Sequence, residues 1–296
     1  MLQPTSYDYT PILGWSSSRY DKFKSCKRQY YYHYYGKHDP EYPRIRIDRL
    51  KKLTSIPLEI GSITHDVIVA VLERLLKSKR RIDTDRFEEF VRRKAELVCR
   101  SGDFFEVYYA EKEQVLKEDL LPAVRECLQA MLRSDRFEWI RDRALTENNE
   151  WLIEPPGYGE ARLEGYKIYC KVDFLFLVKG RATILDWKTG KRDEAKHTSQ
   201  LLGYSVWATN QLGVPADKID PFIAYLRPDY EELGIRPTTE RLRDFTRTMI
   251  DQTEQMYRFC SNYVENVPLE KEAFPMMMEK SAYCRYCNFK ELCGRA

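Results

Sequence analysis

The chain has 296 residues, of which 43% are hydrophobic, so it is long and apolar enough for one large domain or two small ones. Its 49 basic and 46 acidic residues leave a net charge of +3, which excludes a histone-like tail or a surface that binds polyanions throughout. The longest stretch without Asp, Glu, Lys or Arg, residues 197–216, contains Gln200, Asn210 and Gln211, which excludes a membrane span.

The first segment, residues 1–60, is rich in aromatic and basic side chains. Its first 52 residues carry 11 Lys and Arg against 5 acidic residues, with tyrosines interleaved among them. Two interpretations are open: an aromatic-packed segment with a solvated basic face, or a surface that binds nucleic-acid phosphates and stacks bases. The start of the chain lacks the basic and apolar runs of a signal peptide, so we expect a reducing compartment, the cytoplasm.

The rest of the chain predicts helices first and strands afterwards. Apolar residues recur at helical spacing from Gly61 to about Arg143, including the stretches 87–98 and 111–132. The spacing then changes to that of strands. Strands are expected at 151–153, 161–169, 168–178, 182–187 and 221–226, and helices at 197–212 and 239–264. This order predicts an α/β fold with a mixed central sheet flanked by helices.

Two of these strands form a predicted hairpin that turns at residues 179–180. In that register Asp173 lies opposite Asp186, and because side chains alternate along a strand, Lys188 shares their face. Two opposed carboxylates repel each other unless a cation lies between them, so the pattern indicates a divalent metal site. The alternative is an ordinary charged sheet face, with diagonal salt bridges from Asp173 to Lys188 and from Lys171 to Asp186.

Asp173 and the run Asp-Trp-Lys-Thr-Gly at 186–190 resemble the signature of the PD-(D/E)XK nuclease superfamily, in particular its RecB-like branch. Three further segments resemble motifs of that family in the right order. These are Gly-x-x-x-His at 61–65, Gln-x-x-x-Tyr at 200–204, and an N-terminal Ser-x-Ser...Cys-x-Arg-x-Tyr-Tyr segment with Ser16, Ser18, Phe23, Cys26, Arg28, Tyr30 and Tyr31. The resemblance spans residues 16–293.

The resemblance implies a metal centre that cleaves phosphodiesters. Its ligands would be His65, Asp173, Asp186 and the backbone carbonyl of Trp187, and the catalytic residues would be Lys188 and the two aspartates. Oxygen donors favour Mg²⁺ or Mn²⁺, and one imidazole favours Mn²⁺. Lys188 would orient the attacking water and offset charge on the transition-state oxygens. A lone histidine such as His65 could instead be packed as a neutral side chain.

Three more residues are candidates for binding the substrate. Gln200 and Tyr204 lie one helical turn apart on one face, which could contact the substrate strand or simply pack the helix on the sheet. Arg28, in the basic first segment, would contact a phosphate.

Three of the eight cysteines, Cys284, Cys287 and Cys293, crowd the last 13 residues. A four-thiolate metal site requires one more ligand. Similarity to AddB-type and CRISPR-associated RecB-like nucleases implies that Cys26 completes a [4Fe–4S] cluster with a structural role. A four-cysteine Zn²⁺ site and free thiols are the alternatives.

Together these features predict a Mg²⁺- or Mn²⁺-dependent deoxyribonuclease with an iron–sulfur cluster, an exonuclease that prefers single-stranded DNA ends. A non-cleaving DNA-binding subunit of a recombination, repair or CRISPR-adaptation complex and a sequence-dependent duplex endonuclease are the alternatives. The sequence has no Gly-x-x-x-x-Gly-Lys-Ser/Thr loop, so a helicase or a recombination or adaptation partner would separate the strands. The expected segments are the basic–aromatic 1–60, a core helix with a helical insertion at 61–150, the nuclease core at 151–264, and the iron–sulfur segment at 265–296.

Overall fold

The computed structural model of the chain describes residues 3–78, 80–146, 150–278 and 282–295. Contacts within the chain divide it into two compact units. The first unit consists mainly of Thr54–Gly159 and Lys171–Leu242. The second unit combines Thr5–Leu53, Glu160–Cys170 and Arg243–Ala296. Each unit therefore joins segments that are far apart in the sequence.

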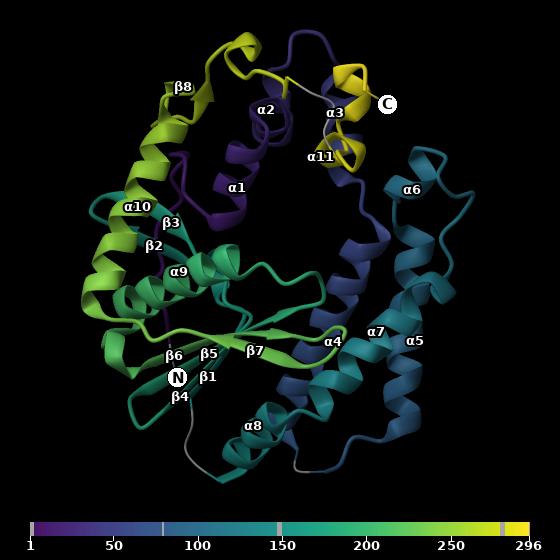
Figure 1. The fold of residues 1–296 in the computed structure, drawn as a ribbon, viewed down its shortest axis with the longest axis vertical. Coiled ribbons are helices and arrows are strands. Elements are labelled where there is room, and N and C mark those ends of the chain that lie inside the picture. The colour runs from purple at the N-terminus through teal and green to yellow at the C-terminus, as the bar shows by residue number, and fades with distance from the viewer. Residues whose placement is uncertain (1–2, 79, 147–149, 279–281, 296) are drawn as a thin grey trace. The chain divides into compact units, whose positions relative to one another are not determined.

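The first unit contains a five-stranded mixed sheet (Figure 1). Its strands, in spatial order, are β1 (Glu150–Ile153), β4 (Phe174–Val178), β5 (Arg181–Lys188), β6 (Ile219–Tyr225) and β7 (Glu231–Gly234). The strands β5 and β6 pair in parallel, whereas the other neighbours pair antiparallel. The central strand β5 is buried along most of its length. The predicted α/β fold with a mixed sheet and helices is confirmed.

The hairpin of β4 and β5 has the register that the sequence predicts. Phe174 pairs with Leu185, and residues 179 and 180 form the turn. Both turn residues have positive φ, 48° and 75°, as the tight turns of two-residue hairpins require. Phe174, Leu185 and Trp187 lie in the hydrophobic core, as expected for one face of the hairpin. On the opposite face Leu175 and Ile184 are also buried, so the charged side chains lie only at the end of the hairpin away from the turn.

Helices make up the rest of the first unit. They are α4 (Ile56–Lys77), α5 (Thr84–Ser101), α6 (Phe105–Tyr108), α7 (Lys117–Leu132), α8 (Asp135–Thr146) and α9 (Glu194–Leu212). The apolar stripes of α4 and α7 pack in one core with Phe174 and Trp187. The helix predicted from residue 111 begins only at Lys117, because the Asp119 side chain accepts a hydrogen bond from the Leu116 N–H, 2.9 Å away, and caps the helix there.

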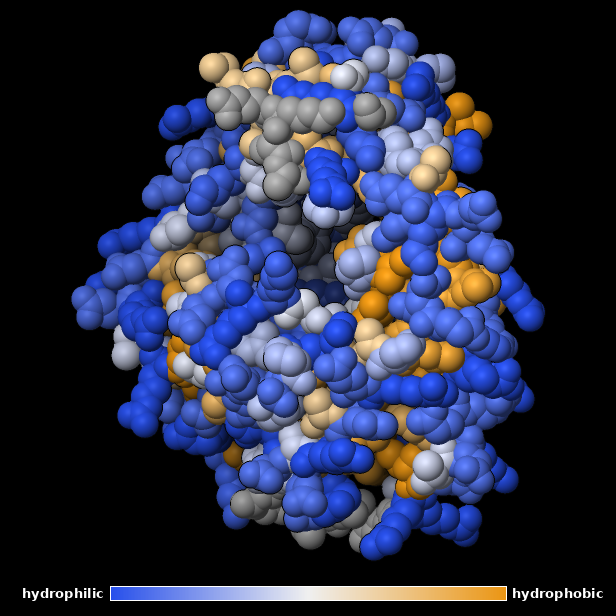
Figure 2. Space-filling view, turned by 45° about the vertical axis from the view of Figure 1, so that its right-hand side comes forward, coloured by the Kyte–Doolittle hydropathy of each residue, from blue (hydrophilic) through white to orange (hydrophobic). Residues whose placement is uncertain are grey.

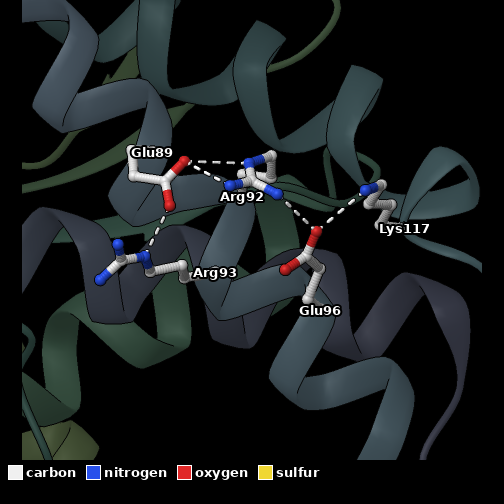
Figure 3. A network of polar contacts seen from close by, with 5 residues as sticks. All are labelled: Glu89, Arg92, Arg93, Glu96 and Lys117. Carbon is white, nitrogen blue, oxygen red and sulfur yellow. Dashed lines mark hydrogen bonds and ion pairs between the residues drawn. The ribbon is translucent and has the colours of Figure 1, made fainter.

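A chain of ion pairs runs along the exposed side of α5 (Figure 3). Glu89 pairs with Arg92 and Arg93, and Glu96 pairs with Arg92 at 2.8 Å and with Lys117 of α7 at 2.9 Å. Exposed pairs of this kind are screened by solvent and stabilise a fold only slightly. Only the pair of Glu96 with Lys117 joins α5 to α7, and the other pairs lie within α5.

A cavity of about 290 Å³ lies between α4 and α5. It is lined mainly by apolar side chains, including Val67, Val71 and Phe87. At 100° per residue, these α4 positions lie on the side of the helix away from His65. The cavity is therefore separate from the residues predicted to bind metal.

Figure 2 shows one face of the molecule, which is largely hydrophilic, with apolar side chains gathered toward the right of the view.

The second unit is mostly helical. Its elements are α1 (Ser17–Ser25), α2 (Lys27–Tyr35), α3 (Arg44–Lys52), β2 (Glu160–Leu163), β3 (Tyr166–Tyr169), most of α10 (Thr239–Tyr257), β8 (Cys260–Asn262), β9 (Val267–Pro268) and α11 (Ala282–Arg285). Tyr30, Tyr31 and Tyr35 of α2 surround Phe274, and all four rings are buried. Because these tyrosines form a core, they are not available to stack bases, and the aromatic-packed interpretation of the first segment holds for them.

Two predicted strands and one predicted helix have different bounds in the structure. The strand expected at 161–169 is a hairpin of β2 and β3, because Glu164 and Gly165 turn the chain with φ of 51° and 87°. The strand expected at 168–178 is interrupted between Tyr169 and Phe174. The helix expected to reach residue 264 ends at Tyr257, because the following residues pair with β9. No helix in the described ranges is long and apolar enough to cross a bilayer.

Candidate metal centre

The two predicted aspartates come together at one end of the β4–β5 hairpin in the first unit. Asp186 lies in β5 and is 2% exposed, and Asp173 lies one residue before β4 with a side chain that is 15% exposed. The Asp173 Oδ2 atom accepts a hydrogen bond from the Trp187 N–H at 3.0 Å. The predicted juxtaposition of the two carboxylates is therefore present, just beyond the last paired residues of β4.

The helix α4 brings His65 to the same place. The His65 Nε2 atom lies 2.8 Å from the Trp187 carbonyl oxygen, to which it can only donate, and Nδ1 lies 3.3 Å from Asp173 Oδ2. A Cβ atom at Gly61 would lie 3.3 Å from the Thr189 hydroxyl, so glycine allows the start of α4 to approach the segment after β5 closely. His65 therefore contacts two of the other predicted ligands.

Electrostatics at this site favour a cation. Burial, followed by the negative charge of Asp186, raises the pKa of Asp173 to about 7, while His65 and Lys188 oppose the shift. Lys188 forms an ion pair with Asp186 Oδ1. The Lys188 ammonium thus offsets part of the negative charge that the two aspartates bring together.

The diagonal salt bridges of the alternative interpretation do not form. Lys188 pairs with Asp186 on its own strand, and Lys171 pairs with Glu154 at 2.7 Å. The charged face of the hairpin is therefore organised around the two aspartates and not as a row of cross-strand ion pairs.

Gln200 and Tyr204 of α9 also contact Asp186. The Tyr204 hydroxyl donates to Asp186 Oδ2 at 2.5 Å, and Gln200 Nε2 donates to the same oxygen at 3.1 Å and to the Tyr204 hydroxyl at 2.6 Å. Tyr204 is 4% exposed. The sequence left open a substrate contact or packing of the helix on the sheet, and in the structure both side chains contact a predicted metal ligand.

One residue near the site was missed by sequence reasoning. His197 precedes Gln200 on α9, and its Nδ1 atom forms a 2.6 Å hydrogen bond with the hydroxyl of Tyr225, which pairs with Lys188 in the sheet. Burial, then the charge of Lys188, lowers the pKa of His197. The spacing of residues 197, 200 and 204 along one helix was the available signal.

The predicted iron–sulfur ligands lie in the second unit. Cys26, Cys284, Cys287 and Cys293 line one cavity, although they come from opposite ends of the chain. Burial raises the pKa of the Cys287 thiol to about 11 and raises that of Cys293. Among the described residues, no group of three or more His, Cys, Asp or Glu side chains could hold a metal ion as placed, either at this cavity or at the Asp173–Asp186 site. Four thiols around one cavity are the donor set that a four-thiolate metal site requires.

Arg28, the third predicted substrate-binding residue, is half-buried near the Cys293 thiol in the second unit. Its Nε atom donates to the Phe274 carbonyl at 2.8 Å, and its charge acts on the Cys293 thiol. The guanidinium therefore has a structural contact in the second unit.

Comparisons with known proteins give the following. The fold is similar to the crystal structure of a proposed exonuclease from Eubacterium rectale, with 15% identity, 92% of this chain and 87% of that chain covered, and a TM-score of 0.46. It is also similar to the crystal structure of SSO0001, with 16% identity, coverage of 64% and 79%, and a TM-score of 0.31. Both scores are low, so neither likeness supports a conclusion about this chain. No curated protein matches the sequence.

A family model described as the PD-(D/E)XK nuclease superfamily matches residues 14–294. The match covers nearly the whole chain and includes Asp173, Asp186 and Lys188. The chain therefore belongs to the PD-(D/E)XK nuclease superfamily.

Proposed function

We propose that the chain is a Mg²⁺- or Mn²⁺-dependent deoxyribonuclease that hydrolyses phosphodiester bonds. The observation that carries this proposal is the convergence of His65, Asp173, Asp186 and the Trp187 carbonyl beside Lys188. Oxygen donors dominate this set, which suits Mg²⁺ or Mn²⁺, and the imidazole favours Mn²⁺. Membership of a nuclease superfamily supports the same reaction.

Each side chain has a role that follows from its contacts. A divalent ion bound here would withdraw charge from the scissile phosphate and lower the pKa of water. Lys188, held beside Asp186, can orient the attacking water and offset negative charge in the transition state. Gln200 and Tyr204 fix the Asp186 carboxylate, so that the site needs little reorganisation during the reaction.

A cleavage assay on end-labelled DNA tests the proposal. The wild-type chain should cut only with Mn²⁺ or Mg²⁺, and Asp186→Asn should reduce the rate at least about 100-fold. Asp229→Asn, at an exposed carboxylate after β6, is the matched control and should leave the rate unchanged. Tight DNA binding without any metal-dependent cleavage by the wild-type chain would support a non-cleaving subunit instead.

We also propose single-stranded ends as the preferred substrate of an exonuclease reaction. The buried tyrosines of α2 cannot supply base stacking, so the support comes from two other features. Exposed lysines such as Lys24 of α1 and Lys52 of α3 can offset phosphate charge without reading bases. The sequence also has no motor loop, so a helicase or a recombination or adaptation partner would supply single strands.

The substrate proposal is tested by comparing linear single strands with covalently closed duplex circles in the same buffer. Linear single strands should be degraded from an end, and binding should weaken steeply as salt increases. Rapid cutting of the circles at one defined sequence, with single strands left intact, would support a duplex endonuclease and contradict the proposal.

We propose further that Cys26, Cys284, Cys287 and Cys293 hold a [4Fe–4S] cluster with a structural role. Four thiolates are the donors that such a cluster needs, and these four line one cavity. The cluster would join residue 26 to the C-terminal segment and would restrict the unfolded chain, as a cross-link that closes a long loop does.

Iron and sulfide analysis of anaerobically purified protein tests the cluster. Wild-type protein should contain equal amounts of both, and Cys26→Ala and Cys287→Ala should lose both. Cys99→Ala, which changes a thiol of α5 in the first unit, is the control and should lose neither. Stoichiometric zinc without sulfide would contradict the cluster and support the zinc alternative.

A further inference from the structure

Arg295 of the second unit makes a direct contact with one of the four cysteines. Its Nη1 atom lies 3.1 Å from Cys284 Sγ, and its Nη2 atom donates to the carbonyl of Met277. The guanidinium is therefore held by two hydrogen bonds, with one N–H aimed at sulfur. Cys284 itself is 8% exposed, so the contact is sheltered from solvent.

The surroundings of the four sulfur atoms are positively charged. Among the described residues that line the cavity, Lys290 and Arg295 are cations and none is a carboxylate. The Gln29 backbone N–H lies 3.4 Å from Cys26 Sγ. Donors and cations of this kind stabilise thiolates and negative charge on a group that the thiolates hold.

These contacts would act on the charge of a cluster held by the four thiolates. One-electron reduction of a cluster adds a negative charge without breaking a bond, so a cation that donates a hydrogen bond to a ligand sulfur stabilises the reduced state more than the oxidised state. Hydrogen bonds to sulfur and local charge are among the features that set reduction potentials. Arg295 supplies both at Cys284.

We infer that Arg295 sets the reduction potential of an iron–sulfur cluster held by Cys26, Cys284, Cys287 and Cys293, through its N–H···S hydrogen bond to Cys284. The inference rests on the proposed cluster. Arg295 is then a positioning residue, which acts on the cluster through the ligand Cys284. Arg295→Met should make the cluster harder to reduce, and Arg295→Lys, which keeps the charge but loses the planar fork, should shift the potential in the same direction by less.

The experiment is an anaerobic redox titration of the full chain with dithionite and mediators, in which the reduced cluster is measured by electron paramagnetic resonance. At a fixed ambient potential, the ratio of reduced to oxidised cluster in Arg295→Met should fall at least tenfold, a shift of about 59 mV for one electron. Arg285→Met is the matched control. Arg285 follows Cys284 directly and is exposed, and its guanidinium lies 5.5 Å from the Tyr286 ring centroid. The reduction potential of the cluster in Arg285→Met should therefore equal that of the wild type.

The possible results separate the two proposals. Wild-type protein without iron and sulfide would overturn both the cluster and this inference. A wild-type cluster whose potential is unchanged in Arg295→Met would overturn the inference alone. If Arg295→Met does not retain its cluster, Arg295→Lys is titrated in its place, and a potential equal to that of the wild type would overturn the inference.

Discussion

Replacing Asp173 with Asn in metal-free protein removes one of the two carboxylates at the end of the β4–β5 hairpin. Burial and the charge of Asp186 raise the pKa of Asp173 from 3.8 to about 7. The folded state therefore holds the proton more tightly than the unfolded state. The resulting cost to stability is absent below about pH 3.8, grows as pH rises to about 7, and is fully present above that. We therefore expect the variant to be more stable than the wild type.

The size of the stability gain follows from the pKa shift of Asp173. At about 1.36 kcal/mol per pKa unit, the largest possible gain in the free energy of unfolding is about 1.5 kcal/mol at pH 5 and about 4 kcal/mol at pH 8. Asn keeps an oxygen that can accept the hydrogen bond from Trp187 N–H, so the local geometry survives. Relaxation of the pair and solvent lower the gain, and we expect roughly 1–3 kcal/mol at pH 8.

Thermal unfolding in EDTA under anaerobic conditions measures the difference. A gain of this size corresponds to an increase of several degrees in Tm, since about 1 kcal/mol shifts a domain of this size by roughly 2–4 °C. The gain should be larger at pH 8 than at pH 5. Asp229→Asn, at an exposed carboxylate, should leave Tm unchanged. An Asp173→Asn protein that is no more stable than the wild type at pH 8, or a gain that is equal at both pH values, would refute the reasoning.

Three further outcomes are expected. Tyr204→Phe removes the hydroxyl that donates to Asp186 and should lower kcat about tenfold in steady-state cleavage assays, while a change confined to KM would indicate a substrate contact instead. Lys188→Met should lose turnover at least about 100-fold yet keep Mn²⁺ binding, and weaker binding in calorimetry would argue against its catalytic role. Phe274→Ala, in the tyrosine core of the second unit, should destabilise that unit by about 3–5 kcal/mol in urea unfolding followed by hydrogen exchange, and a loss below about 1 kcal/mol would contradict the packing described.

The hairpin could be predicted from the sequence because its signals are local. A Gly at residue 180 marks the turn, and counting back from the turn sets the register of the two strands. Apolar and charged residues alternate at 171–174 and at 185–188, which places the aspartates on one face. Once the register is known, the positions of Asp173 and Asp186 follow. His65 could be assigned only through the family resemblance, because its approach to Trp187 depends on the packing of α4 against the segment after β5.

Other features depended on contacts that no local pattern reveals. The strand predicted at 161–169 has suitable side chains throughout, but the turn at Gly165 folds it back on itself. Gln200 and Tyr204 lie on the expected helix face, yet only the tertiary structure shows that this face meets Asp186. The tyrosines of α2 looked equally suited to bases and to a core, and the choice depends on Phe274, more than 200 residues away in the sequence.

The central claim is that His65, Asp173, Asp186 and the Trp187 carbonyl hold one catalytic divalent ion. Calorimetric titration of metal-free protein with Mn²⁺ tests it most directly. The account predicts binding to the wild type, loss of binding in Asp186→Asn, and binding at least as tight in Lys188→Met, because removal of the lysine frees the Asp186 carboxylate. Mn²⁺ binding that is unchanged in Asp173→Asn and in Asp186→Asn would contradict the account.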